Sequence, residues 1–150
     1  MSVSDLIQHY LAPELLTGGN QYQCDNCNML RDAVKTVCVC AGPEYLNITL
    51  LRFKYDRATQ RRAKVFTAVD YPEYLALPVS GAVSLYRLYS VVVHSGYSSD
   101  GGHYYTWSRH TAWIVLNDSV ATTTSSWDTF KQQTSKLSRD TAYLLFYQRL

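Results

Sequence analysis

The stretch covering residues 86–105 constrains the fold of this 150-residue chain more than any other part of it. It begins as an apolar run that includes three consecutive valines, breaks at a polar loop with several glycines, and re-enters apolar sequence at His103. Aromatic and β-branched residues favour strands, and glycine favours tight connections. The pattern therefore predicts two strands joined by a short loop, with His103 on the first residues of the second strand.

His103 in that position is suited to proton transfer. Imidazole gains and loses a proton near neutral pH, and the preceding glycines let a substrate backbone approach closely. A histidine between glycine and tyrosine is ordinarily structural, but a following apolar segment ends in Asn117 and Asp118. A histidine oriented by an amide or carboxylate on a neighbouring strand is two-thirds of a cysteine-protease triad. These residues predict a general base and its orienting partner, and the nucleophile has still to be found.

The four cysteines form two pairs with different spacing. Cys24 and Cys27 are separated by two residues, a spacing that lets two thiolates bind one side of a tetrahedral zinc ion. One such pair is only half a site. Cys38 and Cys40 alternate within an apolar segment, which predicts a strand with both thiols on one buried face.

Composition excludes several classes of function. The net charge of +2 is too small and too scattered to predict a nucleic-acid partner, and residues 57–64 hold the one local basic cluster, Arg57, Arg61, Arg62 and Lys64. No apolar run is long enough to predict a membrane span, and residues 1–5 do not resemble a signal peptide. We therefore expect one globular domain that works inside the cell, in the cytoplasm, the nucleus or both.

The remaining pattern predicts an α+β fold with a mostly antiparallel sheet. Apolar residues at helical spacing predict a helix within residues 2–16, and a second, short helix is expected over residues 127–133. The expected strands cover residues 45–53, 64–69 and 142–147, with a polar hairpin loop at 55–60. Residues 71–79 and 122–126 are expected to be irregular connections.

These motifs together resemble the catalytic domain of ubiquitin-specific proteases, the papain-like deubiquitinating enzymes. The histidine box of that family is matched at nine positions, Tyr86, Leu88, Ser90, Val91, His94, Gly96, Gly102, His103 and Tyr104. The Cys24/Cys27 pair and the segments 45–53 and 142–147 follow the order of the family, so the resemblance covers essentially the whole chain. In finer detail, residues 49–53, 90–96 and 140–143 resemble the subfamily of ubiquitin carboxyl-terminal hydrolases thirty-five and thirty-eight.

The resemblance implies a fold, a set of site residues and a partner. The fold would be the fingers and palm of a papain-like cysteine protease without its helical thumb, with residues 1–40 forming a helix and part of the fingers and 41–150 the palm. The partners would be ubiquitin and ubiquitinated proteins, together with the missing N-terminal half of the domain. A structural zinc ion would bind Cys24 and Cys27, and no organic cofactor is implied.

The resemblance gives His103 as the general base and Asn117 as the third triad member. It gives Asp118 as an alternative partner, and the substrate-binding residues as Phe53, Ser95, Gly101, Gly102 and Tyr104.

The chain departs from the family in one respect that decides the function. It contains no Gly-Asn-Thr-Cys-Tyr box, which carries the nucleophilic cysteine in the family, and it contains one CxxC where the zinc site needs two. We expect the C-terminal half of a deubiquitinase that is inactive by itself and active when joined to the other half. The alternatives are a non-catalytic ubiquitin-binding pseudo-protease and, more weakly supported, a structural β domain.

Overall fold

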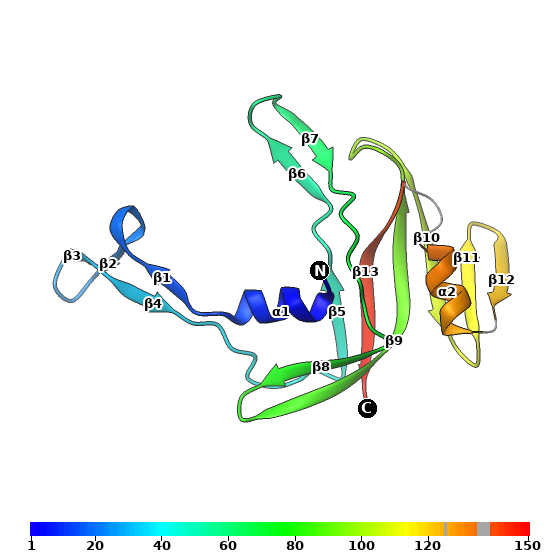
Figure 1. Ribbon diagram of the computed structural model, residues 1–150, viewed down its shortest axis with the longest axis horizontal. Coiled ribbons are helices and arrows are strands. Elements are labelled where there is room, and N and C mark those ends of the chain that lie inside the picture. Colours follow the sequence, from blue (N-terminus) through cyan, green and yellow to red (C-terminus); the bar gives the residue numbers. More distant parts are fainter. Residues whose placement is uncertain (125, 135–138) are drawn as a thin grey trace.

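The computed structural model describes residues 1–124, 126–134 and 139–150 (Figure 1). In these ranges the helical elements are α1 (Val3–Leu11), the 3-10 helix η1 (Gly18–Asn20) and α2 (Trp127–Thr134). The strands, in chain order, are β1 (Glu14–Leu16), β2 (Tyr22–Cys24), β3 (Met29–Arg31), β4 (Ala33–Lys35), β5 (Tyr45–Thr49), β6 (Phe53–Asp56), β7 (Arg61–Lys64), β8 (Tyr74–Val79), β9 (Ala82–Ser95), β10 (His103–Arg109), β11 (Trp113–Asn117), β12 (Val120–Thr124) and β13 (Asp140–Arg149). None of the described helices is long and apolar enough to cross a membrane.

A central antiparallel sheet organises the molecule. Within the described residues its strands follow the order β12-β11-β10-β9-β13-β5, and β8 also pairs with β9. The long strand β9 has two partners along one edge, since β8 pairs with its first half and β10 with its second half. Strand β13 pairs with β9 along the other edge. This arrangement agrees with the predicted α+β fold with a mostly antiparallel sheet and few helices.

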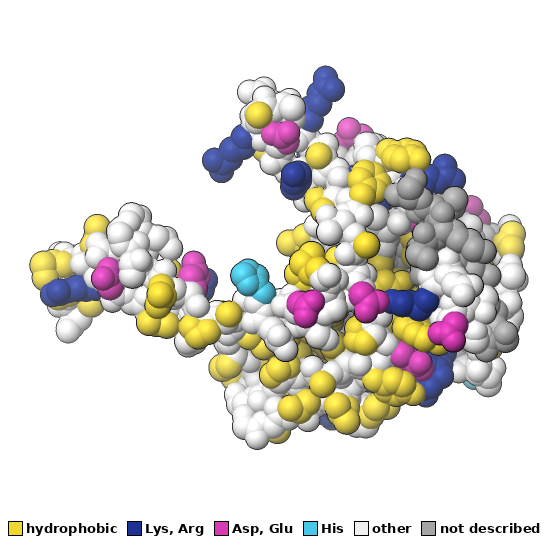
Figure 2. Space-filling view, in the orientation of Figure 1, with side chains coloured by type: hydrophobic (Ala, Val, Ile, Leu, Met, Phe, Trp, Pro, Cys, Tyr) yellow, Lys and Arg dark blue, Asp and Glu magenta, His cyan; other side chains and the backbone are white. Residues whose placement is uncertain are grey.

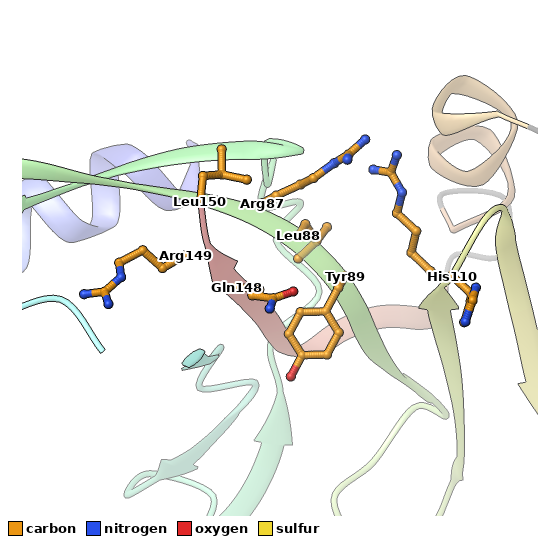
Figure 3. Close-up of a pocket in the computed structure, with 8 residues that line it drawn as sticks. Arg87, Leu88, Tyr89, His110, Gln148, Arg149 and Leu150 are labelled. Atoms are coloured by element: carbon orange, nitrogen blue, oxygen red, sulfur yellow. The ribbon is translucent and has the colours of Figure 1, made fainter. Parts of the chain in front are cut away.

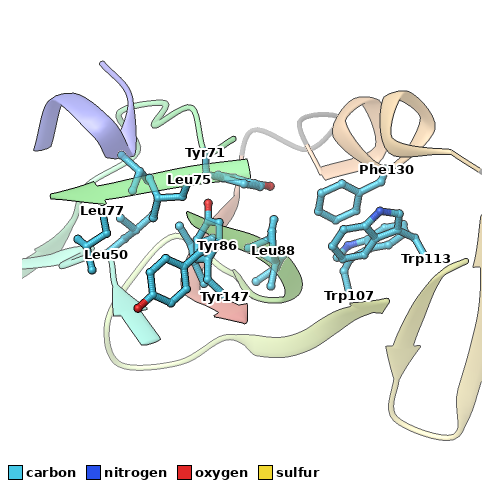
Figure 4. Packing of buried hydrophobic residues seen from close by; sticks show 14 residues of the cluster. Leu50, Tyr71, Leu75, Leu77, Tyr86, Leu88, Trp107, Trp113, Phe130 and Tyr147 are labelled. Carbon is cyan, nitrogen blue, oxygen red and sulfur yellow. The ribbon is translucent and has the colours of Figure 1, made fainter. Parts of the chain in front are cut away.

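The core lies between the sheet and the two helices (Figure 4). Phe130 of α2 is fully buried and stacks on Trp113, with ring centroids 4.2 Å apart and an angle of 7° between the planes. Trp107 and Trp127 also contact the Phe130 ring, at centroid distances of 5.1 Å and 5.0 Å. Aromatic rings bury large apolar areas, so this cluster fixes α2 against strands β10 and β11.

Local chemistry sets the bounds of α1. The Ser2 hydroxyl accepts from the Asp5 backbone N–H at 3.1 Å while the Asp5 carboxylate accepts from the Ser2 N–H at 2.7 Å. This capping box starts the helix, and Pro13 prevents it from continuing. The helix is therefore shorter than residues 2–16, and β1 takes the end of that range. Of the apolar residues at helical spacing, Val3 is buried, but Tyr10 is 71% exposed.

Two short ribbons form an arm that projects from the body of the molecule (Figure 1). Strand β1 pairs with β4, and β2 pairs with β3 at the far end. The predicted strand through Cys38 and Cys40 is wrong, because β4 ends at Lys35 and both thiols are exposed. The alternation itself is present with the opposite face inward, since Val39 packs against the core.

Three other predicted segments differ from the structure. The expected strand 45–53 is interrupted, because Arg52 turns inward and donates to the carbonyls of Thr67 and Ala142 at 2.6 Å and 2.9 Å. Strand β7 ends where the expected strand 64–69 begins. Residues 71–79, expected to be irregular, contain β8, which among the described strands pairs with β9 alone; proline is tolerated in such an edge strand. Of the expected connection 122–126, residues 122–124 belong to β12, and Ser125 lies outside the described residues.

Candidate active site

The structure brings His103 and Asn117 together. His103 is the first residue of β10 and Asn117 the last of β11, and the antiparallel pairing of these strands places their ends side by side. The Nε2 atom of His103 lies 2.5 Å from the amide oxygen of Asn117. An amide oxygen accepts hydrogen bonds and does not donate them, so Nε2 carries the proton in this arrangement. The lone pair then resides on Nδ1, where it can accept a proton from a nucleophile.

Asp118 is a more distant neighbour of the same imidazole. Its Oδ2 atom lies 3.9 Å from His103 Nε2, and its side chain is 80% exposed. Asp118 has a φ of 52° in the tight turn between β11 and β12, a conformation that Asp tolerates better than most residues. The hydrogen bond that orients His103 therefore belongs to Asn117, and Asp118 adds a partly screened negative charge.

His94 packs against the glycine loop that precedes His103. A Cβ added at Gly102 would lie 2.2 Å from His94 Nε2, so the imidazole occupies the space that a side chain there would need. The ring is 3% exposed and lies between Phe53 and Tyr104, with centroid distances of 5.4 Å and 4.8 Å. Burial lowers the pKa of His94, the nearby Lys64 charge lowers it further, and Asp140 opposes both. His94 is therefore a neutral packing residue, and its position explains the glycine at 102.

Lys64 ties the segments around this loop together. Its buried ammonium group donates to three backbone carbonyls, those of His94 at 3.0 Å, Gly96 at 2.8 Å and Arg139 at 2.7 Å. These carbonyls belong to the end of β9, to the glycine loop and to the turn before β13. Burial lowers the pKa of Lys64, although Asp140 acts in the opposite direction. Three hydrogen bonds satisfy all three ammonium donors, which makes Lys64 a fixed anchor.

The other predicted substrate-binding residues surround the same loop. Ser95 pairs with His103 across β9 and β10, and Tyr104 is 50% exposed beside it. Phe53 begins β6 and contacts the rings of His94 and Tyr143. A Cβ at Gly101 would meet none of the described atoms within 4 Å, so the surface there is open.

None of the four cysteines forms a hydrogen bond with His103 within the described residues. Cys24 and Cys27 lie on the arm, and Cys38 and Cys40 lie in the segment that follows β4. The His103–Asn117 pair is thus assembled without a thiol partner from the described part of this chain. Sequence reasoning had found the pair, but the Lys64 anchor has no signal in the sequence, because its three partners are backbone atoms of distant segments.

Cys24 and Cys27 fit half of a zinc site. Backbone N–H groups of Cys27 and Asn26 donate to the Cys24 sulfur, and these bonds lower the pKa of its thiol. Arg31 donates to the Cys27 sulfur at 3.5 Å. The bonds to Cys24 favour its thiolate, the form that binds zinc. No group of three or more potential metal ligands is found among the described residues, so two further ligands would have to come from elsewhere.

A separate pocket lies where the C-terminal ends of β10 and β13 approach the middle of β9 (Figure 3). It has a volume of about 240 Å³ and is lined by Arg87, Leu88, Tyr89, Arg109, His110, Gln148, Arg149 and Leu150. Arg87 and Arg109 both bind the carboxylate of Glu73, so much of their charge is already compensated. The pocket does not include His103 or Asn117.

Comparisons with known proteins show the family of this chain. The family model described as ubiquitin carboxyl-terminal hydrolase matches residues 11–147. Human ubiquitin carboxyl-terminal hydrolase 35 is 41% identical over 99% of this chain, and human ubiquitin carboxyl-terminal hydrolase 42 is 31% identical over 99%. The chain spans 16% and 11% of the length of these relatives.

Solved structures show the same fold. A chain of the yeast SAGA DUB module superposes on this one with a TM-score of 0.80 at 25% sequence identity, covering 99% of this chain and 33% of that chain. A structure of the module bound to ubiquitin aldehyde gives a TM-score of 0.80 at 23% identity over the same shares of the two chains. The papain-like fold predicted from the sequence is thereby confirmed.

Proposed function

Because this chain belongs to the ubiquitin carboxyl-terminal hydrolase family, we propose that it is the C-terminal half of a deubiquitinating cysteine protease. The observation that carries this proposal is the short hydrogen bond between His103 and Asn117 at the end of the sheet. In this proposal the bond orients His103 as a general base that activates a nucleophile. Ubiquitin is the proposed partner, because a solved relative with the same fold is described as bound to ubiquitin aldehyde.

The proposed reaction hydrolyses the amide or isopeptide bond at the ubiquitin C-terminus. His103 Nδ1 removes the proton from a cysteine thiol that lies outside this chain, and the thiolate attacks the carbonyl carbon. The imidazolium then gives its proton to the leaving amine, which departs as a thioester forms. In the second half, His103 deprotonates a water molecule that hydrolyses the thioester and releases the thiol. Asn117 holds the ring in the productive tautomer throughout.

The size of the exposed surface supports the proposal of a missing half. The described chain has an accessible surface of 10037 Å², whereas a compact monomer of 17.1 kDa would expose about 7800 Å². Figure 2 shows one reason, a hollow between the arm and the body of the molecule. A second segment that fills this hollow would complete the domain. We propose that it also supplies two ligands to zinc at Cys24 and Cys27, which would brace the arm, and that the complete protein works in the cytoplasm or nucleus.

The test begins with the 5′ end of the native transcript, read through any frame continuous with Met1. We expect an upstream Gly-Asn-Thr-Cys-Tyr box and a second CxxC, and we expect the complete product to cleave a fluorogenic ubiquitin amide. The 150-residue chain alone should show no turnover. Thiol-dependent turnover by this chain alone would contradict the proposal. A true start at Met1, combined with ubiquitin binding, would favour the non-catalytic alternative.

His103→Ala in the complete protein tests the assigned base directly. Loss of a triad member typically lowers turnover by several orders of magnitude, about a thousand-fold or more, while substrate binding survives. The measurement is kcat and KM on the ubiquitin amide, with His110→Ala, just beyond the opposite end of β10, as the matched control. Near-normal kcat in His103→Ala would show that another group is the base.

A further inference from the structure

We propose that the hairpin formed by β6 and β7 is an electrostatic docking surface for an acidic segment of the protein to which ubiquitin is attached. This inference rests on the proposed function for the identity of the partner. The structure itself supplies the surface, its charge and its place beside the loop that leads to His103 (Figure 1).

The hairpin holds a disproportionate share of the positive charge. Residues 53–64 contain five of the fourteen Lys and Arg residues and one of the twelve Asp and Glu residues. Their net charge is therefore +4, whereas the rest of the chain, with nine basic and eleven acidic residues, has a net charge of −2. In Figure 2 the Lys and Arg side chains stand out from the projecting hairpin. The charge asymmetry indicates one localised basic surface rather than a generally basic protein.

Four of these cations are exposed and form no ion pair within the described part of the chain. Lys54, Arg57, Arg61 and Arg62 all lie on the surface, and none of them takes part in an ion pair formed by described residues. Asp56 is the one carboxylate of the hairpin, and it accepts the backbone N–H groups of its own turn, Ala58 at 2.9 Å and Thr59 at 3.4 Å. The cations are therefore available to an external anion.

The hairpin is anchored at its base. Lys64, the last residue of β7, donates to the His94, Gly96 and Arg139 carbonyls, and Phe53 at the start of β6 packs on the His94 ring. Farther along, the Phe66 ring contacts that of Tyr97 in the glycine loop, with centroids 6.1 Å apart. These contacts hold the hairpin at a fixed place next to the loop. A target protein joined to ubiquitin at the scissile bond would lie within reach of it.

The charge distribution favours an acidic protein segment over a nucleic acid. A nucleic acid presents regularly spaced phosphates over a long track, and proteins that bind it neutralise many of them. Here the basic surface is confined to one hairpin, and the rest of the chain is net acidic and would repel a long polyanion. A short run of Glu and Asp matches both the size and the sign of the surface.

The test measures binding of a fluorescein-labelled Glu-rich peptide to the 150-residue chain by fluorescence anisotropy. The variant replaces two hairpin cations, Arg61→Gln and Arg62→Gln. A control variant makes the same change in net charge elsewhere on the surface, Lys35→Gln and Arg149→Gln. Circular dichroism checks that both variants fold like the parent chain.

The hairpin variant is expected to bind the peptide about ten-fold more weakly, and the control variant within about two-fold of the parent. Binding should weaken as salt rises from about 10 mM to about 150 mM, because the Debye length falls from about 30 Å to about 8 Å. Equal losses in both variants, or no binding by the parent chain, would overturn the proposal. Tighter binding of a single-stranded oligonucleotide than of the peptide would also overturn it.

A second measurement separates this inference from the proposed function. The complete protein is assayed on ubiquitin fused through its C-terminus to a Glu-rich or a Gln-rich peptide. We expect the ratio of kcat/KM for the acidic over the neutral fusion to exceed one and to return to one in the hairpin variant. Hairpin-dependent peptide binding without cleavage of either fusion would contradict the proposed reaction and leave the docking surface supported. Cleavage of both fusions at a ratio of one in the parent would contradict the docking surface alone.

Discussion

At the scale of single residues, the structure distinguishes the two candidates for orienting His103. Asn117 makes the short contact with Nε2, while Asp118 lies farther away and is largely exposed to solvent. Water screens the Asp118 charge, and its distance is too long for a hydrogen bond. Sequence reasoning left both residues open, because adjacent positions at the end of a strand differ by the direction in which their side chains point.

This difference predicts the order of effects in the complete protein. Asn117→Ala should lower kcat by about ten- to a hundred-fold, less than His103→Ala, because Asp118 can still favour the productive ring orientation. Asp118→Ala alone should lower kcat by less than about three-fold, and the double variant should lose more than Asn117→Ala. Steady-state kinetics on a ubiquitin amide gives all three values. A larger loss for Asp118→Ala than for Asn117→Ala would reverse the assignment.

His94 gives a pH dependence of stability whose sign follows from its environment. Burial, with the Lys64 charge acting in the same direction, holds the pKa of His94 below the ordinary histidine value of about 6.5. Above that pH both the folded and the unfolded chain carry a neutral imidazole. As the pH falls through it, the unfolded chain takes up a proton that the folded chain excludes, so the free energy of unfolding decreases.

We therefore expect the denaturant midpoint of unfolding to decrease as the pH is lowered from about 7.5 to about 5.5. The midpoint of the His94→Gln variant should change less with pH over the same range. The exposed His9→Gln variant is the matched control and should keep the slope of the parent chain. A slope unchanged by His94→Gln would show that other groups produce the pH dependence.

At the scale of elements, α2 depends on one aromatic side chain. Phe130 is fully buried and lies against the rings of Trp107, Trp113 and Trp127. The helix is short and its sequence is mostly polar, so tertiary packing supplies most of its stability. The helix in turn covers the end of the sheet formed by β10 and β11, the strands that carry His103 and Asn117.

Phe130→Ala should destabilise the chain by about 3–5 kcal/mol, because a cavity replaces a large buried ring. Equilibrium denaturation followed by tryptophan fluorescence measures the loss, since three tryptophan rings surround or adjoin this site. Asp128→Ala, on the exposed side of the same helix, should cost less than about 1 kcal/mol. Similar losses for the two variants would show that α2 is not held by the Phe130 cluster.

At the scale of the whole molecule, much apolar surface stays exposed. Leu51 is 86% exposed, Leu15 on the arm 68% and Tyr97 in the glycine loop 68%. The arm also presents two short ribbons whose outer backbone groups are unpaired within the described residues. Exposed apolar surface and free strand edges favour association with other chains.

We expect the isolated chain to self-associate at concentrations of tens of micromolar and to unfold over a broad range of denaturant. Sedimentation velocity at several concentrations measures the association, and the proposed complete domain, in which this surface would be covered, serves as the control. A monomeric chain with a sharp, cooperative transition would show that the chain is stable without a partner.

The sequence by itself determined the strand-loop-strand unit around His103, the polar loop of the hairpin at β6 and β7, and the helix that begins at Trp127. These features depend on periodicity, glycine placement and capping, which act between residues close together in the chain. The family resemblance was equally accessible, because the nine positions of the histidine box lie within one short segment.

Tertiary structure decided the remainder. The three carbonyls that bind Lys64 come from segments far apart in the chain, and backbone atoms leave no mark on the residue types. Cys38 and Cys40 are exposed because Val39, which lies between them, packs against the core. The alternating sequence is compatible with either face turned inward, so it could not predict which one is buried. Which of Asn117 and Asp118 contacts His103 likewise depended on the turn between β11 and β12. This turn fixes the direction of each side chain only once both strands are paired in the sheet.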